Sequence, residues 1–152
     1  MKLNRREWGQ VVAGGVLLSG TMPEAIAQES GGKIRYCIVG LGRISMQHFM
    51  PAVKNSSHSK ITALVSGHRD KAEREAAKYG VPVTNIYSYE NYDEIAKNKD
   101  IDAMYIALPN SMHAEYTIRA AKAGKHVLCE KPMATSVKDS EAMIDACRSA
   151  RK

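Results

Sequence analysis

The sequence is poor in aromatic residues, in long hydrophobic runs and in clustered charge of one sign. Aromatic residues make up 6% of the 152 positions, too few for a sheet whose rings stack on nucleic-acid bases. The net charge of +6 comes from lysines and arginines interspersed with acids, so binding of nucleic acid by a basic stripe is not expected. The apolar stretches are too short to span a bilayer, so we expect no membrane insertion. The composition is that of a globular domain. We also expect no metal site.

The first 27 residues have the composition of an export signal. They begin with a basic stretch that contains Arg5 and Arg6, and Gly9–Gly20 is apolar and rich in small residues. Ala25–Ala27 (AIA) fits the small-residue cleavage site of a signal peptide. The paired arginines before a weakly hydrophobic segment indicate the twin-arginine route, and hence the periplasm. The alternative is an amphipathic N-terminal arm. Residues 28–32 would then be a short flexible lead.

Strand-like and helix-like segments alternate from residue 33 to residue 152. Strands separated by helices pair in parallel through right-handed crossovers. The alternation therefore predicts a doubly wound α/β fold with a parallel sheet, the Rossmann dinucleotide-binding fold. A six-stranded fold of this kind would place one more strand after the last helix, so we expect the domain to be incomplete. Strands are expected at 34–39, 61–65, 86–87, 101–108 and 126–129, and helical segments at 43–54, 70–80, 92–97, 114–124 and from 136 onward.

Single prolines, glycines and short polar residues mark the expected helix ends. Pro51 lies within the first helical segment and is expected to bend it. Asp70 is expected to cap the next helix, and Gly80 to end it. Ser136 is expected to begin the last helix, with Asp139 as its capping-box partner. The buried face of that helix is expected to carry Val137, Ser140, Ile144 and Cys147.

The cysteines are three in number, and their places in the expected sheet argue against a disulfide. Cys37 lies on the first strand, which is apolar enough to be buried on both faces, and Cys129 lies on the fifth. The fourth strand lies between these two in the usual strand order, which separates them by roughly 10 Å. A disulfide cannot span that distance. We therefore expect Cys37, Cys129 and Cys147 to be buried small hydrophobic residues.

A glycine turn, Gly40–Ser45 (GLGRIS), follows the first strand and begins the first helix. Gly40 permits the tight turn, Gly42 lets a pyrophosphate approach the backbone, and the helix start supplies amide donors. Ser45 stands where a third glycine belongs, which is expected to loosen the packing of helix on strand although serine is small enough to fit. The position of the turn between a strand and a helix favours nucleotide binding over a purely structural turn.

The end of the second strand lacks the acid that holds the ribose 2′-hydroxyl in NAD-binding folds. The sequence there reads VSGHR from Val65 to Arg69. Ser66, Arg69 and Lys71 offer hydrogen bonds and positive charge for a 2′-phosphate at a helix start. The alternative is a solvated polar loop without a ligand. The pattern favours NADP over NAD as the cofactor.

Two further polar segments follow the fourth and fifth strands, at the edge of the sheet where ligands bind in this architecture. The first is Leu108–His113 (LPNSMH) and the second is Cys129–Met133 (CEKPM). Lys131 could protonate or orient a substrate oxygen, and Glu130 could set its charge state. The proline that follows is expected to fix the turn, as a trans or a cis peptide. By chemistry alone, Glu130 and Lys131 could equally be a surface ion pair, and His113 an exposed loop histidine or a helix cap.

Three segments in this order resemble one family: G-L-G at Gly40–Gly42, P-N-x-x-H at Pro109–His113 and E-K-P at Glu130–Pro132. It is the glucose–fructose oxidoreductase, inositol dehydrogenase and rhizopine-catabolism family (Gfo/Idh/MocA), and the resemblance covers residues 33–152. The resemblance implies that Lys131 is the catalytic lysine, with Glu130 beside it at the nicotinamide. The cofactor contacts expected in all are Gly40, Leu41, Gly42, Arg43, Ile44, Ser66, Arg69, Lys71, Leu108, Pro109, Asn110, His113, Glu130 and Lys131.

The resemblance also assigns these contacts to parts of the cofactor and implies an activity. Residues 40–43 would touch the pyrophosphate, and Ser66 and Lys71 the 2′-phosphate. The nicotinamide ribose would be lined by Pro109, Asn110 and His113. The leader and the stretch 107–137 are most similar to the periplasmic glucose–fructose oxidoreductase type. This implies an exported, NADP-dependent sugar oxidoreductase that transfers a hydride.

Two alternatives to that activity stay open. One is an NAD-dependent glycosidase of the same superfamily, and the other is a truncated, non-catalytic nucleotide-binding module. The implied partners are a small-molecule sugar and, in a full-length protein, further copies of the same chain. The resemblance also implies a second α+β domain that makes most substrate contacts, and this domain is missing from the sequence.

Overall fold

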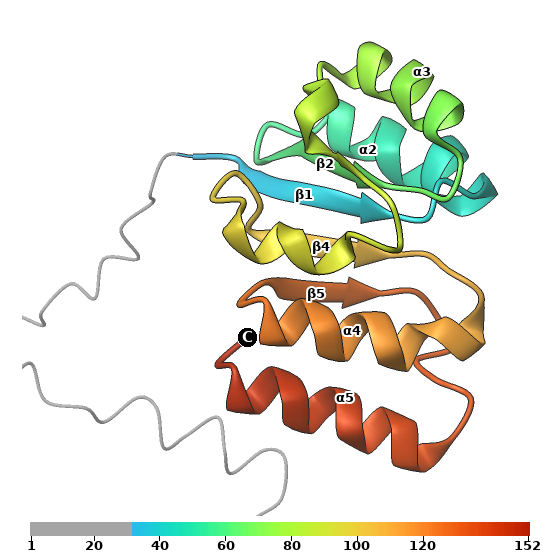
Figure 1. Ribbon diagram of the computed structural model, residues 1–152, viewed down its shortest axis with the longest axis vertical. Helices are drawn as coiled ribbons and strands as arrows, with labels where there is room; N and C mark the ends of the chain where they lie inside the picture. The colour runs from blue at the N-terminus through green and yellow to red at the C-terminus, as the bar shows by residue number, and fades with distance from the viewer. Residues whose placement is uncertain (1–31) are drawn as a thin grey trace, which may run out of the picture. The chain divides into compact units, whose positions relative to one another are not determined.

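The computed structural model describes residues 32–152, which contain a parallel sheet flanked by helices (Figure 1). Its five strands lie in the order β3-β2-β1-β4-β5, and every neighbouring pair is parallel. The predicted doubly wound sheet is therefore confirmed. The predicted leader (1–27) and residues 28–31 of the expected lead lie outside the described residues. The strands are β1 (Ile34–Val39), β2 (Ser59–Val65), β3 (Ile86–Tyr87), β4 (Ala103–Ile106) and β5 (His126–Cys129).

Helices fill the connections between the strands. Within residues 32–152, no helix is both long enough and apolar enough to cross a membrane. The longest helix, α5, packs chiefly against its neighbour α4. The helical segments are the π-helical turn η2 (Ser45–Phe49), α2 (Met50–Lys54), α3 (Arg69–Tyr79), α4 (His113–Lys122), α5 (Val137–Ser149), and the 3-10 turns η3 (Val83–Asn85), η4 (Tyr92–Lys97) and η5 (Asn110–Met112).

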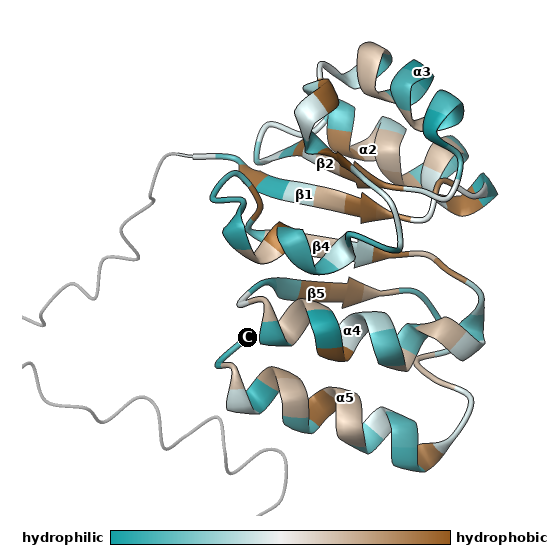
Figure 2. Cartoon of the chain, in the orientation of Figure 1, coloured by the Kyte–Doolittle hydropathy of each residue, from teal (hydrophilic) through white to brown (hydrophobic). Residues whose placement is uncertain are grey.

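Two apolar cores lie on opposite faces of the sheet, because successive side chains of a strand point to opposite faces. On one face, Ile38 and Leu64 pack with residues of η2, α2 and α3. On the other face, Val39 and Val65 pack with residues of η4 and α4. Figure 2 shows hydrophobic colours concentrated on the strands and mixed colours on the surrounding helices. Each group of helices thus packs its apolar side on one face of the sheet.

The expected burial of β1 on both faces is wrong for its first half. The segment Cys37–Val39 is buried, but Ile34 exposes 47% of its surface. Next to it, Arg35 pairs with Asp102 just before β4, with 2.7 Å between Nη2 and Oδ1. Charged groups rather than helices therefore close this edge of the sheet, so the apolar sequence of β1 did not bring burial there.

The expected helix over 43–54 forms, but it contains a π-helical turn instead of a simple bend at Pro51. The Met50 N–H donates to the Ser45 carbonyl, five residues back. A proline has no N–H and its ring clashes with the carbonyl four residues earlier. Because the wide turn ends just before it, Pro51 lies in the first turn of α2, where its missing N–H removes no helical bond.

The expected cap at Asp70 is wrong, whereas the expected helix end at Gly80 is confirmed. The helix α3 begins one residue earlier, at Arg69, so Asp70 lies inside its first turn. There the carboxylate accepts a hydrogen bond from Arg74 at 2.9 Å, and the helix dipole favours its charge. Gly80 ends α3 with a φ of 68°, a left-handed conformation that glycine adopts without strain.

The start of α5 is confirmed, but its expected buried face is wrong. Ser136 caps the helix, and its Oγ accepts the Asp139 N–H at 3.0 Å. The buried residue of α5 is Met143, whereas Val137 exposes 75% of its surface and Ile144 exposes 39%. The physical reason is that α5 lies against α4, which covers a narrower strip of the helix than a sheet would. Ser140 and Cys147 are partly buried.

The cysteines of the described residues are all free, as expected. The strand β4 separates two of them, because Met104 pairs with Cys37 and Ile106 pairs with Cys129. Cys37 is fully buried, and burial raises the pKa of its thiol. Cys129 and Cys147 are only partly buried, so the expectation of three buried cysteines holds for Cys37 alone.

Candidate cofactor and active site

The predicted site residues follow β1, β2, β4 and β5, and they lie in the loops or in the first turns of the helices after them. The arrows of β1, β4 and β5 point the same way in Figure 1, so their following loops lie at one edge of the sheet. The chain runs from β1 to β2 on one side and reaches β4 on the other side of β1. The loop after β1 therefore lies at the switch point of the topology, where ligands bind in open α/β sheets.

Gly40 lies in the turn after β1, close to the backbone of β2 on one side and to the residues after β4 on the other. Its N–H donates to the Val65 carbonyl of β2 at 3.0 Å, and its φ is 91°. A Cβ at this position would lie 2.6 Å from the carbonyl oxygen of Ala107, which follows β4. Only glycine fits both the backbone conformation and the space, as the sequence predicts for the tight turn.

Gly42 lies on the exposed side of the same turn. A Cβ there would meet no atom within 4 Å, so the backbone of Gly42 can be approached closely. Arg43 and Ile44 are exposed beside it. Ser45 is fully buried, and its Oγ donates to the Gly40 carbonyl at 2.6 Å. The serine in place of the third glycine therefore fits the site and connects the helix to the turn by a hydrogen bond.

Lys71, in the first turn of α3, contacts the glycine turn after β1. Its Nζ donates to the Leu41 carbonyl, which brings one predicted 2′-phosphate contact against the pyrophosphate turn. Ser66 exposes 7% of its surface, and its Oγ accepts the His68 N–H at 3.1 Å. The structure thus brings Lys71 to the predicted site with its ammonium group directed at the turn.

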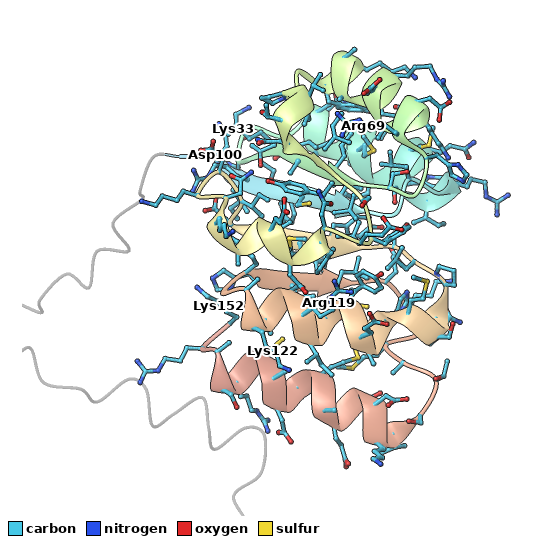
Figure 3. All side chains as sticks on the ribbon, viewed as in Figure 1. Lys33, Arg69, Asp100, Arg119, Lys122 and Lys152 are labelled. Carbon is cyan, nitrogen blue, oxygen red and sulfur yellow. The ribbon has the colours of Figure 1, made fainter. Side chains whose placement is uncertain are left out.

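Arg69 lies differently from the sequence prediction. Its guanidinium donates to Glu73 at 2.7 Å and to the Ile86 carbonyl at 3.1 Å, and Figure 3 labels it at the start of α3. The bond to Ile86 connects α3 to β3, so the structure does not group Arg69 with the contact between Lys71 and Leu41. The nearest acid in sequence, Asp70, pairs with Arg74, and this hydrogen bond lowers the pKa of Asp70.

Glu130 and Lys131 follow β5, and the peptide between Lys131 and Pro132 is cis. Glu130 Oε1 accepts the Tyr105 hydroxyl at 2.5 Å, and Oε2 accepts the Lys131 backbone N–H at 3.2 Å. The bond from Tyr105 is the largest cause that lowers the pKa of Glu130. Lys131 is exposed. Among the described residues, the ion pairs within 4 Å do not include Glu130 with Lys131, so this is not the surface ion pair of the alternative interpretation.

His113 is neither an exposed loop residue nor a helix cap, because it is fully buried. One ring nitrogen lies 2.9 Å from the Pro132 carbonyl and the other 2.9 Å from the Leu108 carbonyl. The ring therefore joins the loops after β4 and β5 from the inside. This differs from the ribose contact that the resemblance implies, since exposed Pro109 and Asn110 form the surface of that loop.

Sequence reasoning missed two residues of this arrangement, Tyr105 and Phe49. Tyr105 lies in the middle of β4, and its ring is stacked on Phe49 with centroids 3.6 Å apart. The sequence does contain a signal for Tyr105, because a tyrosine in a buried strand needs a hydrogen-bond partner for its hydroxyl. Phe49 carries no such signal, because its place depends on the π-helical turn.

The sequence matches a family of oxidoreductases over nearly all the described residues. The family model for "Oxidoreductase family, NAD-binding Rossmann fold" (Gfo/Idh/MocA) matches residues 34–152. The chain belongs to the Gfo/Idh/MocA oxidoreductase family. The matched region includes all four loops at the carboxyl edge. This Gfo/Idh/MocA domain is therefore a Rossmann nucleotide-binding domain of NAD(P)-dependent oxidoreductases.

Several relatives of this Gfo/Idh/MocA domain are named as oxidoreductases, and two of those described below name a sugar. An aldose-aldose oxidoreductase from Caulobacter crescentus, solved with glycerol, is 48% identical with a TM-score of 0.77, and the match covers 79% of this chain and 36% of that one. A 3-ketoreductase from Actinomadura kijaniata, solved with NADP, is 31% identical with a TM-score of 0.71, over 78% and 36% of the two chains. D-xylose 1-dehydrogenase (NADP(+)) from Haloarcula marismortui is 35% identical over 75% of this chain and 31% of its own. The chain spans about a third of these relatives' length.

Proposed function

We propose that this chain is the nucleotide-binding domain of an exported, NADP-dependent sugar oxidoreductase of the glucose–fructose oxidoreductase type. The observation that carries the proposal is the contact between the first turn of α3 and the glycine turn after β1. Lys71 Nζ donates to the Leu41 carbonyl of the glycine turn, and Ser66 directly follows β2, at the position where an acid would hold a ribose 2′-hydroxyl. A hydroxyl and an ammonium group beside the pyrophosphate turn are suited to a 2′-phosphate.

The residues at this edge fit a dinucleotide. Gly42 leaves its backbone open, and the amides that begin the following helix would hold the pyrophosphate. When bound, NADP supplies a hydride acceptor or donor. The exposed Lys131 would orient a sugar oxygen and carry its proton. Glu130 would keep a negative charge near Lys131, since its pKa is lowered.

The relatives support the choice of cofactor and substrate class. The Haloarcula enzyme is named as using NADP(+), and the Actinomadura ketoreductase was solved with NADP. A dehydrogenase from Bordetella pertussis of similar fold was solved with NADH, so the fold alone does not select between the two cofactors. The absence of an acid at the end of β2 therefore favours NADP in this chain, and a sugar is the proposed substrate.

The proposed location is the periplasm, and the support for it lies in the sequence. The adjacent Arg5 and Arg6, the apolar segment Gly9–Gly20 and the cleavage pattern at Ala25–Ala27 follow the order of a twin-arginine signal. Further copies of the chain are the proposed partners in a full-length protein, as the family resemblance implies.

Fluorescence titration with NADPH and with NADH tests the proposed cofactor. We expect NADPH to bind at least about tenfold more tightly, which corresponds to about 1.4 kcal/mol. Lys71→Ala should remove most of this difference. Lys122→Ala, at the exposed end of α4 (Figure 3), is the matched control and should preserve it. Equal dissociation constants in the unsubstituted chain would contradict the choice of NADP, and no binding of either would contradict the nucleotide site itself.

A further inference from the structure

Glu130 is held by a residue outside the sequence motifs. The Tyr105 hydroxyl donates to Glu130 Oε1 at 2.5 Å, while Glu130 Oε2 accepts the Lys131 backbone N–H at 3.2 Å. Tyr105 exposes 2% of its surface and comes from β4, whereas Glu130 follows β5. One carboxylate oxygen is therefore directed by a side chain of the sheet, and the other by the backbone of the segment after β5.

Phe49 in turn holds the ring of Tyr105. The two rings are stacked, with centroids 3.6 Å apart and an angle of 8° between their planes. Tyr36 meets the other side of this arrangement, its ring edge-on to Phe49 at 5.5 Å. Phe49 ends the π-helical turn η2, and π turns are frequent at functional sites. The helix that begins at the glycine turn thus contacts Tyr105 directly.

The bond from Tyr105 also acts on the charge of Glu130. A donor to a carboxylate favours its ionised form, and the Tyr105 hydroxyl is the first cause of the lowered pKa of Glu130, with the charges of Lys131 and His113 adding to it. Burial and the neighbouring Glu130 raise the pKa of Tyr105. Tyr105 therefore stays protonated and remains a donor while Glu130 stays an anion.

We propose that Tyr105 is a positioning residue of the active site, which holds the Glu130 carboxylate as an oriented anion beside Lys131. This inference rests on the proposed function, because it takes Glu130 and Lys131 to face the nicotinamide and the sugar. Without the hydroxyl, Glu130 keeps only the Lys131 backbone N–H as a fixed donor, and its side chain gains rotamers. The negative charge beside the Lys131 ammonium group would then lose its fixed place.

Tyr105→Phe tests this role, because it removes one oxygen and keeps the ring stacked on Phe49. The 152-residue chain is labelled with ¹³C at the glutamate carboxyl carbons, and Glu130→Gln identifies the Glu130 signal. In an NMR titration we expect the midpoint of Glu130 to move upward, toward the ordinary range of glutamate, in Tyr105→Phe. Tyr36→Phe is the matched control, since it removes a hydroxyl from the other ring against Phe49, and it should leave the midpoint unchanged.

An unchanged Glu130 midpoint in a folded Tyr105→Phe variant would overturn the proposal. Equal upward shifts in Tyr105→Phe and Tyr36→Phe would also overturn it, because they would indicate a general loosening around Phe49. If Tyr105→Phe does not fold, the hydroxyl proton of Tyr105 gives a second test. We expect its downfield resonance to move upfield in Glu130→Gln, and an unmoved resonance would refute the bond.

NADPH titration of the same samples separates this inference from the proposed function. If the unsubstituted chain fails to bind NADPH, the proposed function fails, and with it the role of Tyr105 in an active site. If NADPH binds and the Glu130 midpoint does not move in Tyr105→Phe, the inference about Tyr105 alone fails. Tight NADPH binding together with the upward shift supports both.

Discussion

Replacing Gly40 by alanine adds one methyl group where the structure has neither the space nor the backbone conformation for it. The new Cβ would lie 2.6 Å from the Ala107 carbonyl oxygen and 2.8 Å from Leu108 Cδ2, and the φ of 91° is left-handed. The left-handed conformation costs an L-residue roughly 1–2 kcal/mol. Overpacking between β1 and β4 costs about 1–3 kcal/mol more. We therefore expect the free energy of unfolding to fall by about 2–5 kcal/mol, a large part of the roughly 5–15 kcal/mol of a typical domain.

Gly42→Ala is the matched control for this prediction, because the same methyl group enters open space there. We expect its free energy of unfolding to stay within about 0.5 kcal/mol of the unsubstituted chain. Its affinity for NADPH should fall at least about tenfold, since the methyl group occupies the approach of the pyrophosphate. Urea denaturation followed by circular dichroism measures the first quantity, and fluorescence titration measures the second.

The two variants together can refute the reasoning about the turn. If Gly40→Ala unfolds at the same urea concentration as the unsubstituted chain, the claim that Gly40 is packed too closely against the residues after β4 to accept a methyl group is wrong. If Gly42→Ala binds NADPH as tightly as the unsubstituted chain, the pyrophosphate does not approach the backbone there.

Three further predictions concern the ion pair of Arg35 with Asp102 at the start of β1 and β4, the leader and the buried histidine. The hydrogen bond from Arg35 lowers the pKa of Asp102 from 3.8 to about 2, so the pair stabilises the fold above about pH 4 and loses that contribution as the pH falls toward about 2. The Asp102 side chain is 38% exposed, so screening by solvent keeps the contribution at about 1 kcal/mol or less. Asp102→Asn should flatten the acid dependence of the unfolding free energy. An unaltered dependence on pH would contradict the pairing. Replacing Arg5 and Arg6 by lysine should leave uncleaved protein in the cytoplasm on cell fractionation, whereas continued recovery from the periplasm would argue against the twin-arginine route. His113→Phe should lower the unfolding free energy by about 1–3 kcal/mol, because the Leu108 and Pro132 carbonyls lose the ring nitrogens that lie 2.9 Å from them; an unchanged melting temperature would show that these contacts contribute no stability.

The strands could be predicted where an apolar run ends at a turn residue. The bounds 34–39, 86–87 and 126–129 agree with β1, β3 and β5. The fourth strand was expected over 101–108 but β4 covers Ala103–Ile106, because Ile101 packs in the core without belonging to the ladder. Apolar character alone does not separate a residue in a strand from a residue packed beside one.

The candidate site could be predicted where one short segment carries the geometry. The glycine turn is such a segment, because Gly40 and Gly42 act through their own backbone. The partners of Arg69, His113 and Glu130 come from segments far away in the chain, so local patterns could not supply them. The burial of His113 in particular depends on how closely the loops after β4 and β5 approach each other.

The π-helical turn makes the first helix one residue longer than its span requires. Its hydrogen bond closes over five residues instead of four, so one of the exposed residues Gln47 and His48 is surplus to the backbone pairing. A chain that lacks one of them could close the same turn as an α-helix and still place Met50 in the core. Phe49 directly precedes Met50, so it would keep its place against Tyr105 as well. A change of length at this point therefore separates the effect of the π-helical turn on the site from the effect of Phe49, without touching any strand.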